Sequence, residues 1–100
     1  MKKAFELSER GIMRGCEPGG CVIMHKTTGE ICGKAHNMVA LHNDPTMHAE
    51  IIAIREACHF FQSADLSDCA MYLSNEPCLM CIGAMHLAKI ETIYVARPQN

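Results

Sequence analysis

Two short motifs, thirty residues apart, constrain this chain more than any other feature of its sequence. The first is His48–Glu50, which reads His-Ala-Glu, and the second is Pro77–Cys81, which reads Pro-Cys-Leu-Met-Cys. Together they contain one imidazole, two thiols and one carboxyl group. Imidazoles and thiolates are preferred ligands of zinc. A fold that uses both motifs must bring two distant segments together around one point.

The spacing within the first motif indicates where a metal would lie. His48 and Glu50 are two residues apart and therefore do not share a helix face. A metal beyond the N-terminal end of a helix can be reached by both, because first-turn side chains fan out around the axis. Asp44 followed by Pro45 predicts such a helix start, with Asp as N-cap and Pro at the first helical position. Pro77 predicts the same for the second motif, and the two helix N-termini would lower the thiol pKa values.

The donor set is typical of a catalytic zinc site. His48, Cys78 and Cys81 supply three ligands and leave the fourth tetrahedral position for water. Zinc lowers the pKa of such a water to about 7. Glu50, adjacent to the ligands, is then a candidate general acid and base. The pattern His-x-Glu…Pro-Cys-x-x-Cys is the signature of zinc enzymes that remove an amino group from a nucleobase.

Two alternatives follow from the same residues. Cys78 and Cys81 alone could form a redox-active pair, as Cys-x-x-Cys does in thioredoxin-like proteins. They could also belong to a closed structural zinc site, with His86, His59 or Cys69 as the fourth ligand. The order of the two motifs, each opening a helix, favours the catalytic interpretation.

Length and composition indicate a single domain over residues 1–100, with 49% hydrophobic residues. The sequence shows neither an apolar run long enough to span a membrane nor a signal segment, so we expect a cytoplasmic protein. An odd number of cysteines, seven, then favours reduced thiols. Those outside the second motif are expected to be small buried apolar residues; they are Cys16, Cys21, Cys32, Cys58 and Cys69.

The charge balance bears on the partner. The formal net charge is −2, which gives no basic surface for a nucleic acid backbone. A polynucleotide substrate is therefore less favoured than a small molecule, without being excluded.

Hydrophobic periodicity and turn signals predict seven elements. Helices are expected over residues 2–13, from Pro45 through Phe61 and from Pro77 onward; strands over 21–25, 30–35, 70–74 and 92–96; and a loop over 37–43. The middle helix carries an apolar stripe, formed by Ile51, Ile54, Ala57, Cys58 and Phe61. The last strand–helix–strand unit predicts a parallel crossover. The order predicts a three-layer α/β fold with a mixed central sheet.

The segments Asn43–Glu50 and Tyr72–Met85 resemble the cytidine deaminase-like superfamily, and within it the guanine deaminase and tRNA adenosine deaminase branch. The resemblance covers nearly the whole chain. It implies a three-layer α-β-α fold and one zinc ion per chain, held by His48, Cys78 and Cys81. It also implies that Glu50 transfers protons.

The resemblance also implies substrate contacts. Asn37 matches the asparagine that hydrogen-bonds the base, a role that suits an amide because it both donates and accepts. The backbone N–H of Ala49 could bind developing charge. The alternative for Asn37 is a loop-capping role. For His36, His42 and His86, an ordinary loop or helix-surface role is favoured over substrate contact.

Two departures from the family pattern affect the prediction. Pro18–Cys21 reads Pro-Gly-Gly-Cys where the family usually has an aromatic residue. Family members continue for several dozen residues after the fourth strand, adding a strand and helices, whereas this sequence ends with Arg97–Asn100. The resemblance therefore implies a C-terminally short domain whose pocket and uncovered strand edge are completed in a homo-oligomer.

The predicted activity is zinc-dependent hydrolysis of a purine base, with guanine converted to xanthine and ammonia. The alternatives are deamination of adenosine in tRNA, a cytosine-type deaminase, and an inactive zinc-binding core.

Overall fold

The structure is a computed structural model, and it describes residues 1–96. The helices are α1 (Lys2–Met13), α2 (Val39–His42), α3 (Ala49–Phe61) and α4 (Leu79–Leu87). The strands are β1 (Gly20–His25), β2 (Ile31–His36), β3 (Cys69–Leu73) and β4 (Thr92–Val95). The C-terminal segment Arg97–Asn100, on which the expectation of a short domain rests, lies outside the described residues.

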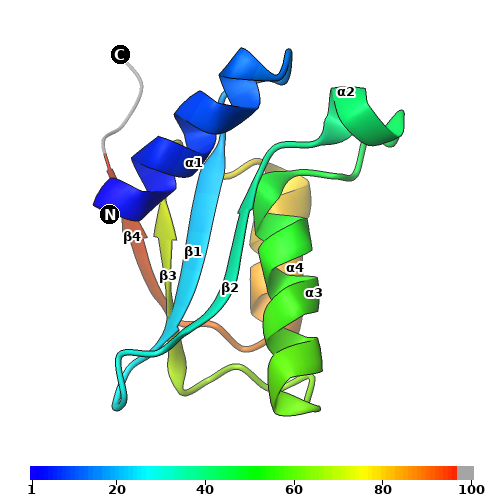
Figure 1. Cartoon of the computed structure of the whole chain (residues 1–100). Coiled ribbons are helices and arrows are strands. Elements are labelled where there is room, and N and C mark those ends of the chain that lie inside the picture. The colour runs from blue at the N-terminus through cyan, green and yellow to red at the C-terminus, as the bar shows by residue number, and fades with distance from the viewer. Residues whose placement is uncertain (97–100) are drawn as a thin grey trace.

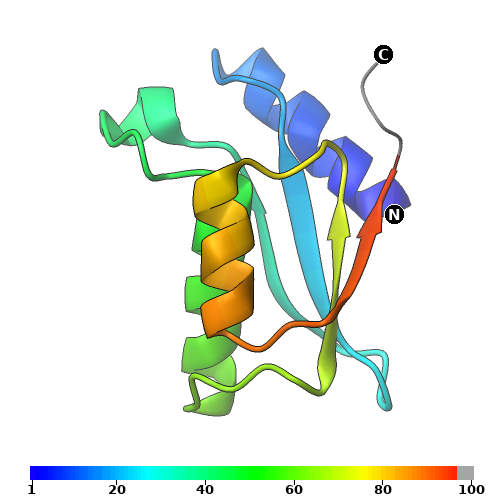
Figure 2. The same cartoon turned by 180° about the vertical axis from the view of Figure 1, so that it is seen from behind.

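The strands form one mixed sheet in the order β2-β1-β3-β4. β1 pairs antiparallel with β2 and β3, and β3 pairs parallel with β4. Helix α1 covers one face of this sheet, and α3 and α4 cover the other (Figures 1 and 2). The predicted three-layer α/β fold, its hairpin and its parallel crossover are confirmed. Within residues 1–96, no helix is long and apolar enough to cross a membrane.

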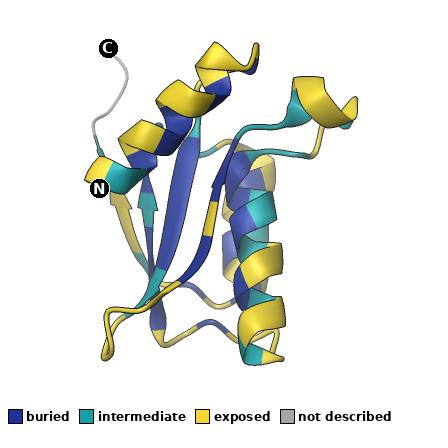
Figure 3. Ribbon diagram, viewed as in Figure 1, coloured by how far each residue is buried: buried dark blue, intermediate teal, exposed yellow. Residues whose placement is uncertain are grey.

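Helix α3 packs on the sheet through small residues. Ala53 and Ala57 are fully buried, and a Cβ atom at Gly33 of β2 would collide with the carbonyl oxygen of Ala53. The backbone of α3 therefore lies directly against the backbone of β2. The predicted apolar stripe lies on this face: Ala57 is fully buried, and Ile51, Ile54, Cys58 and Phe61 pack against the core from partly buried positions. Ala53, which is also fully buried, is not part of the predicted stripe. Figure 3 shows the buried side of α3 turned toward the sheet.

Helix α1 approaches the opposite face equally closely. A Cβ atom at Gly20 of β1 would overlap the carbonyl oxygen of Ala4 in α1. Ala4, Leu7 and Val22 form a small buried cluster there, with Tyr72 packed against it. The two glycines, Gly20 and Gly33, thus set the helix–sheet spacing on both sides of the central hairpin.

One predicted loop and the first residues of two helices differ from the prediction. The segment predicted as a loop over 37–43 contains the single helical turn α2, which ends at Asn43 in the left-handed conformation. Helix α3 begins at Ala49 and α4 at Leu79, rather than at the prolines that precede them. Asp44 accepts hydrogen bonds from the backbone N–H and the hydroxyl of Thr46, at 2.9 and 2.6 Å. It closes a turn there instead of capping α3.

Candidate metal centre and pocket

The candidate metal ligands occupy the starts of two helices. His48 is the N-cap residue of α3 and Cys78 is the N-cap residue of α4, and both have extended backbone angles. Neither side chain makes the capping hydrogen bond usual at this position. Cys81 lies in the first turn of α4. The side chains that would otherwise cap the helices are therefore directed to a common point.

The spacing of these three donors fits a tetrahedral zinc ion. His48 Nδ1 lies 3.6 Å from Cys78 Sγ and 3.5 Å from Cys81 Sγ, and the two sulfur atoms are 3.7 Å apart. Zn–S bonds of about 2.3 Å and Zn–N bonds of about 2.0 Å, at tetrahedral angles, require about 3.8 Å between sulfurs and about 3.6 Å between nitrogen and sulfur. The three residues, hereafter the metal cluster, have the spacing and donor chemistry of a zinc site.

The structure favours the catalytic interpretation of the Cys-x-x-Cys motif over both alternatives. Cys78 and Cys81 are free thiols, and the His48 imidazole lies within 3.6 Å of both sulfur atoms, which a metal site requires and a redox pair does not. In the part of the chain that the structure describes, the ligand group contains no fourth histidine, cysteine or carboxylate. Cys69, one proposed fourth ligand, lies instead beside Cys32, 3.9 Å away between sulfurs. The cluster therefore has the open position of a catalytic site.

Burial dominates the titration of Cys81. The side chain is fully buried, and burial raises the pKa of its thiol, with the Glu50 carboxylate raising it further. The expectation that helix N-termini lower this thiol pKa is wrong for Cys81, because desolvation of a thiolate outweighs the helix dipole. A bound cation reverses this balance by stabilising the thiolate directly.

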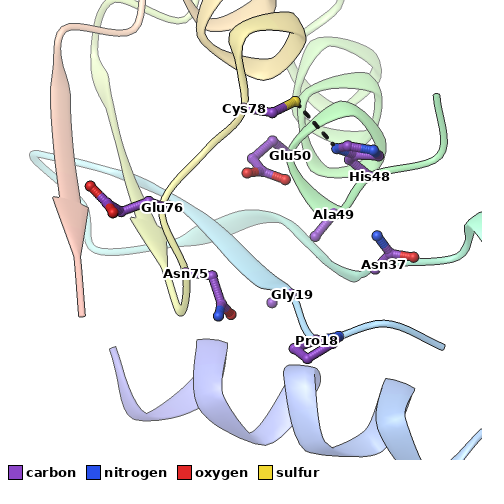
Figure 4. Close-up of a pocket in the computed structure, with 10 residues that line it drawn as sticks. Pro18, Gly19, Asn37, His48, Ala49, Glu50, Asn75, Glu76 and Cys78 are labelled. Carbon is purple, nitrogen blue, oxygen red and sulfur yellow. Dashed lines mark hydrogen bonds between the residues drawn. The ribbon is translucent and has the colours of Figure 1, made fainter. Parts of the chain in front are cut away.

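A pocket of about 170 Å³ opens beside the metal cluster. Its lining includes His48 and Cys78 together with Glu50, Ala49 and Asn37 (Figure 4). Glu50 is only 9% exposed, and Figure 4 shows its carboxylate close to His48 and Cys78. All six residues selected from the sequence thus lie at this site: Asn37, His48, Ala49, Glu50, Cys78 and Cys81.

Asn37 has two roles in this geometry. Its Oδ1 atom accepts a hydrogen bond of 3.1 Å from the N–H of Val39, which is the loop-capping role that the sequence left open. Its backbone N–H donates to the carbonyl oxygen of Gly19 at 2.9 Å. Because Oδ1 is occupied, the side chain has its N–H donors available to the pocket.

Other lining residues were not selected from the sequence. These are Asn75 and Glu76, at the end of the β3–α4 loop, and the backbone of Pro18–Gly20. Asn75 and Glu76 directly precede Pro77, so proximity to the second motif could have identified them. Pro18–Gly20 carries no functional side chain, and only the packing of β1 between β2 and β3 brings it to the pocket.

The three additional histidines do not line this pocket. His36 is buried, with Nδ1 2.7 Å from the carbonyl oxygen of Asn37 and Nε2 3.0 Å from the Arg14 guanidinium. The carbonyl can only accept and the guanidinium can only donate, so Nδ1 donates and Nε2 accepts, and the ring links Arg14 to the backbone at Asn37. His42 and His86 are exposed on α2 and α4. The structure thus places none of the three among the described lining residues of this pocket, in line with an ordinary structural role.

A three-layer α/β domain with a three-ligand metal cluster at two helix N-termini defines a class of metal-dependent hydrolytic domains. Residues 1–97 match the family model described as the cytidine and deoxycytidylate deaminase zinc-binding region. The chain belongs to this family, whose metal is zinc.

Relatives of two activities match with nearly equal identity. The chain is 41% identical to a tRNA-specific adenosine deaminase of Aquifex aeolicus over 93% of its length, and 40% identical to a guanine deaminase of Bacillus subtilis over 96%. The crystal structure of the Bacillus subtilis guanine deaminase superposes with a TM-score of 0.91 over 97% of this chain and 61% of that one. A structure from work on A-to-I editing by tRNA:A34 deaminases superposes with a TM-score of 0.92 over 99% of this chain and 75% of that one, at 30% sequence identity. The chain spans 60–61% of the length of the two curated relatives.

Proposed function

We propose that residues 1–100 form a single zinc-dependent deaminase domain that hydrolyses a free purine base, with guanine converted to xanthine and ammonia. The observation that carries the proposal is the metal cluster, which has tetrahedral zinc spacing and lies beside the buried Glu50 at the wall of a pocket.

The reaction exchanges an amino group for an oxygen. Zinc in the metal cluster would supply the Lewis acid that activates water. Glu50 accepts one proton of the attacking water and delivers it to the ring nitrogen next to the reacting carbon. It then transfers the remaining proton of the added hydroxyl to the departing amino group, which leaves as ammonia. Asn37 hydrogen-bonds the edge of the base, and the N–H of Ala49 stabilises charge that develops near the first turn of α3. Guanine and water thus give xanthine and ammonia.

A free base is favoured over RNA by the charge of the site. The ionisable side chains among the pocket-lining residues described are His48, Glu50, Glu76 and Cys78, with no lysine or arginine. The net charge of the chain is −2. Binding of a polynucleotide rests mainly on cationic contacts to phosphates. The identity to a tRNA adenosine deaminase keeps adenosine in a tRNA anticodon as the second candidate.

The test is ammonia release by the zinc-loaded chain, with zinc quantified in the same sample. The substrates are guanine, adenosine, cytosine, cytidine and an anticodon stem-loop with adenosine at the wobble position. Turnover of guanine alone supports the proposal. Turnover of the stem-loop alone supports the tRNA candidate, and turnover of cytosine or cytidine supports a cytosine-type enzyme. No turnover of any substrate by protein that contains zinc identifies an inactive zinc-binding core.

We also propose that the chain acts as a homo-oligomer in a reducing compartment such as the cytoplasm. Leu79 and Leu87 on α4 are 86% and 81% exposed, and large exposed apolar side chains on one helix mark an interface. All seven cysteines are free thiols, which fits a reducing environment.

A further inference from the structure

Asn75 has a hydrogen-bonding arrangement that the reaction described above does not use. It lies in the β3–α4 loop, and its side chain lines the pocket. Figure 4 shows Asn75 and Asn37 on different sides of the pocket, with Glu50 apart from both and next to His48 and Cys78. The pocket wall thus carries an amide on each of two sides.

A hydrogen bond from the buried Ser74 hydroxyl fixes the orientation of the Asn75 amide. Ser74 Oγ lies 2.6 Å from Asn75 Oδ1 and accepts a hydrogen bond of 2.8 Å from the N–H of Gly20. A separation of 2.6 Å is typical of O–H···O bonds and shorter than N–H···O bonds. The serine hydroxyl therefore donates its single proton to Oδ1 of Asn75. Ser74 is only 6% exposed, so water does not compete for this bond.

The consequence is that both N–H donors of the Asn75 amide are available to a ligand, whereas its oxygen already accepts a hydrogen bond. Its oxygen is occupied by Ser74, just as the oxygen of Asn37 is occupied by Val39. A primary amide has two N–H donors on its nitrogen. The pocket thus presents amide donors on two sides. A base satisfies them with carbonyl oxygens or unprotonated ring nitrogens, whereas an amino group at the same place meets another donor.

We propose that Asn75 is a specificity-determining residue that donates a hydrogen bond to a carbonyl oxygen of the base, so that the site selects oxo-purines over amino-purines. This inference rests on the proposed function and deepens it by naming the feature of the substrate that is recognised. It also distinguishes Asn75 from Glu50, which serves the reacting carbon.

The test compares guanine with 2,6-diaminopurine, which carries an amino group in place of the 6-carbonyl oxygen. Asn75→Asp keeps the size of the side chain but replaces the N–H donors by an acceptor. We expect guanine to lose about 10-fold or more in kcat/KM, mainly through KM, because the carbonyl loses its donor and faces a carboxylate. The ratio of dissociation constants for the two bases, measured by calorimetry, should shift by about 10-fold or more toward 2,6-diaminopurine. Asn75→Ala should weaken the binding of guanine without strengthening the binding of 2,6-diaminopurine.

Asn43→Asp is the charge-matched control. Asn43 is exposed, lies outside the pocket lining and has a left-handed conformation that Asp also tolerates. It should leave the base preference unchanged. The proposal is overturned if Asn75→Asp leaves the base preference unchanged, as the control does. It is also overturned if Asn75→Asp weakens the binding of both bases equally, which would indicate a structural role. Wild-type protein that contains zinc but neither binds nor deaminates guanine would overturn the proposed function instead, and the assignment of Asn75 with it.

Discussion

At the residue scale, the site divides its chemistry between groups that bind metal and a group that moves protons. The donors of the metal cluster lie 3.5–3.7 Å apart, whereas Glu50 is not part of the ligand group. Substitution of a ligand and substitution of Glu50 should therefore have different consequences.

Glu50→Gln should retain zinc and fold and lower turnover by at least about 10²-fold, because an amide cannot accept and return a proton. Zinc content, far-UV circular dichroism and ammonia release measure the three quantities. Glu9→Gln, at an exposed position of α1, removes the same charge and should leave all three unchanged. Loss of zinc in Glu50→Gln would show that Glu50 is a ligand.

Cys78→Ala should lower zinc from about one ion per chain to a small fraction, because two donors hold zinc far more weakly than three. The melting temperature should fall together with the zinc content, since the ion binds only the folded chain. Cys58→Ala removes a partly buried thiol outside the metal cluster and should retain zinc. Equal zinc in the two variants would contradict the ligand assignment.

At the element scale, two glycines allow the helices to approach the sheet, and α3, the first helix of the metal site, depends on this approach. Gly33 of β2 faces the backbone of α3, whose N-cap residue is His48. A displacement of α3 would move the imidazole relative to the two thiols of α4. The packing of a distant strand residue thus contributes to the geometry of the metal cluster.

Gly33→Ala should lower the free energy of unfolding by about 1–3 kcal/mol, because the new methyl group meets the Ala53 carbonyl. Gly83→Ala is the matched control: a Cβ there meets no atom within 4 Å, and alanine favours a helix. It should stabilise by about 0.5–1 kcal/mol. Urea unfolding of both variants measures the difference. Equal stabilities would mean that α3 can shift away from β2 at little cost.

At the scale of the whole molecule, the outer surface of α4 is the unusual feature. Only Cys81 and Met85 of this helix are buried, and Leu79, Ile82 and Leu87 are exposed. Exposed apolar side chains at this density on a nine-residue helix are better explained by contact with another protein surface than by exposure to water.

We expect light scattering at micromolar concentration to give a dimer or larger assembly. The double substitution Leu79→Ser and Leu87→Ser should shift it toward monomer by removing apolar surface from the contact, while zinc content stays the same. Met13→Ser, at an 88% exposed position of α1, is the control on the other face of the sheet and should leave the assembly unchanged. A stable wild-type monomer would contradict the proposal.

The sequence by itself determined the chemistry and the order of elements. The candidate ligands and Glu50 are predicted because the spacing within each motif is local, whereas Asn37 is predicted only from the family resemblance. Strand bounds agree to within a residue because alternation and turn signals are local too. Only the tertiary structure decided the rest. Asp44 is predicted to cap a helix but closes a turn with Thr46, and Ala53, outside the predicted stripe, is fully buried because Gly33 lets the backbones meet. The orientation of the Asn75 amide depends on Ser74 and on Gly20, a residue of another strand 54 positions away from Ser74 in the chain. No local pattern contains such a contact, since its energy exists only after the sheet has formed.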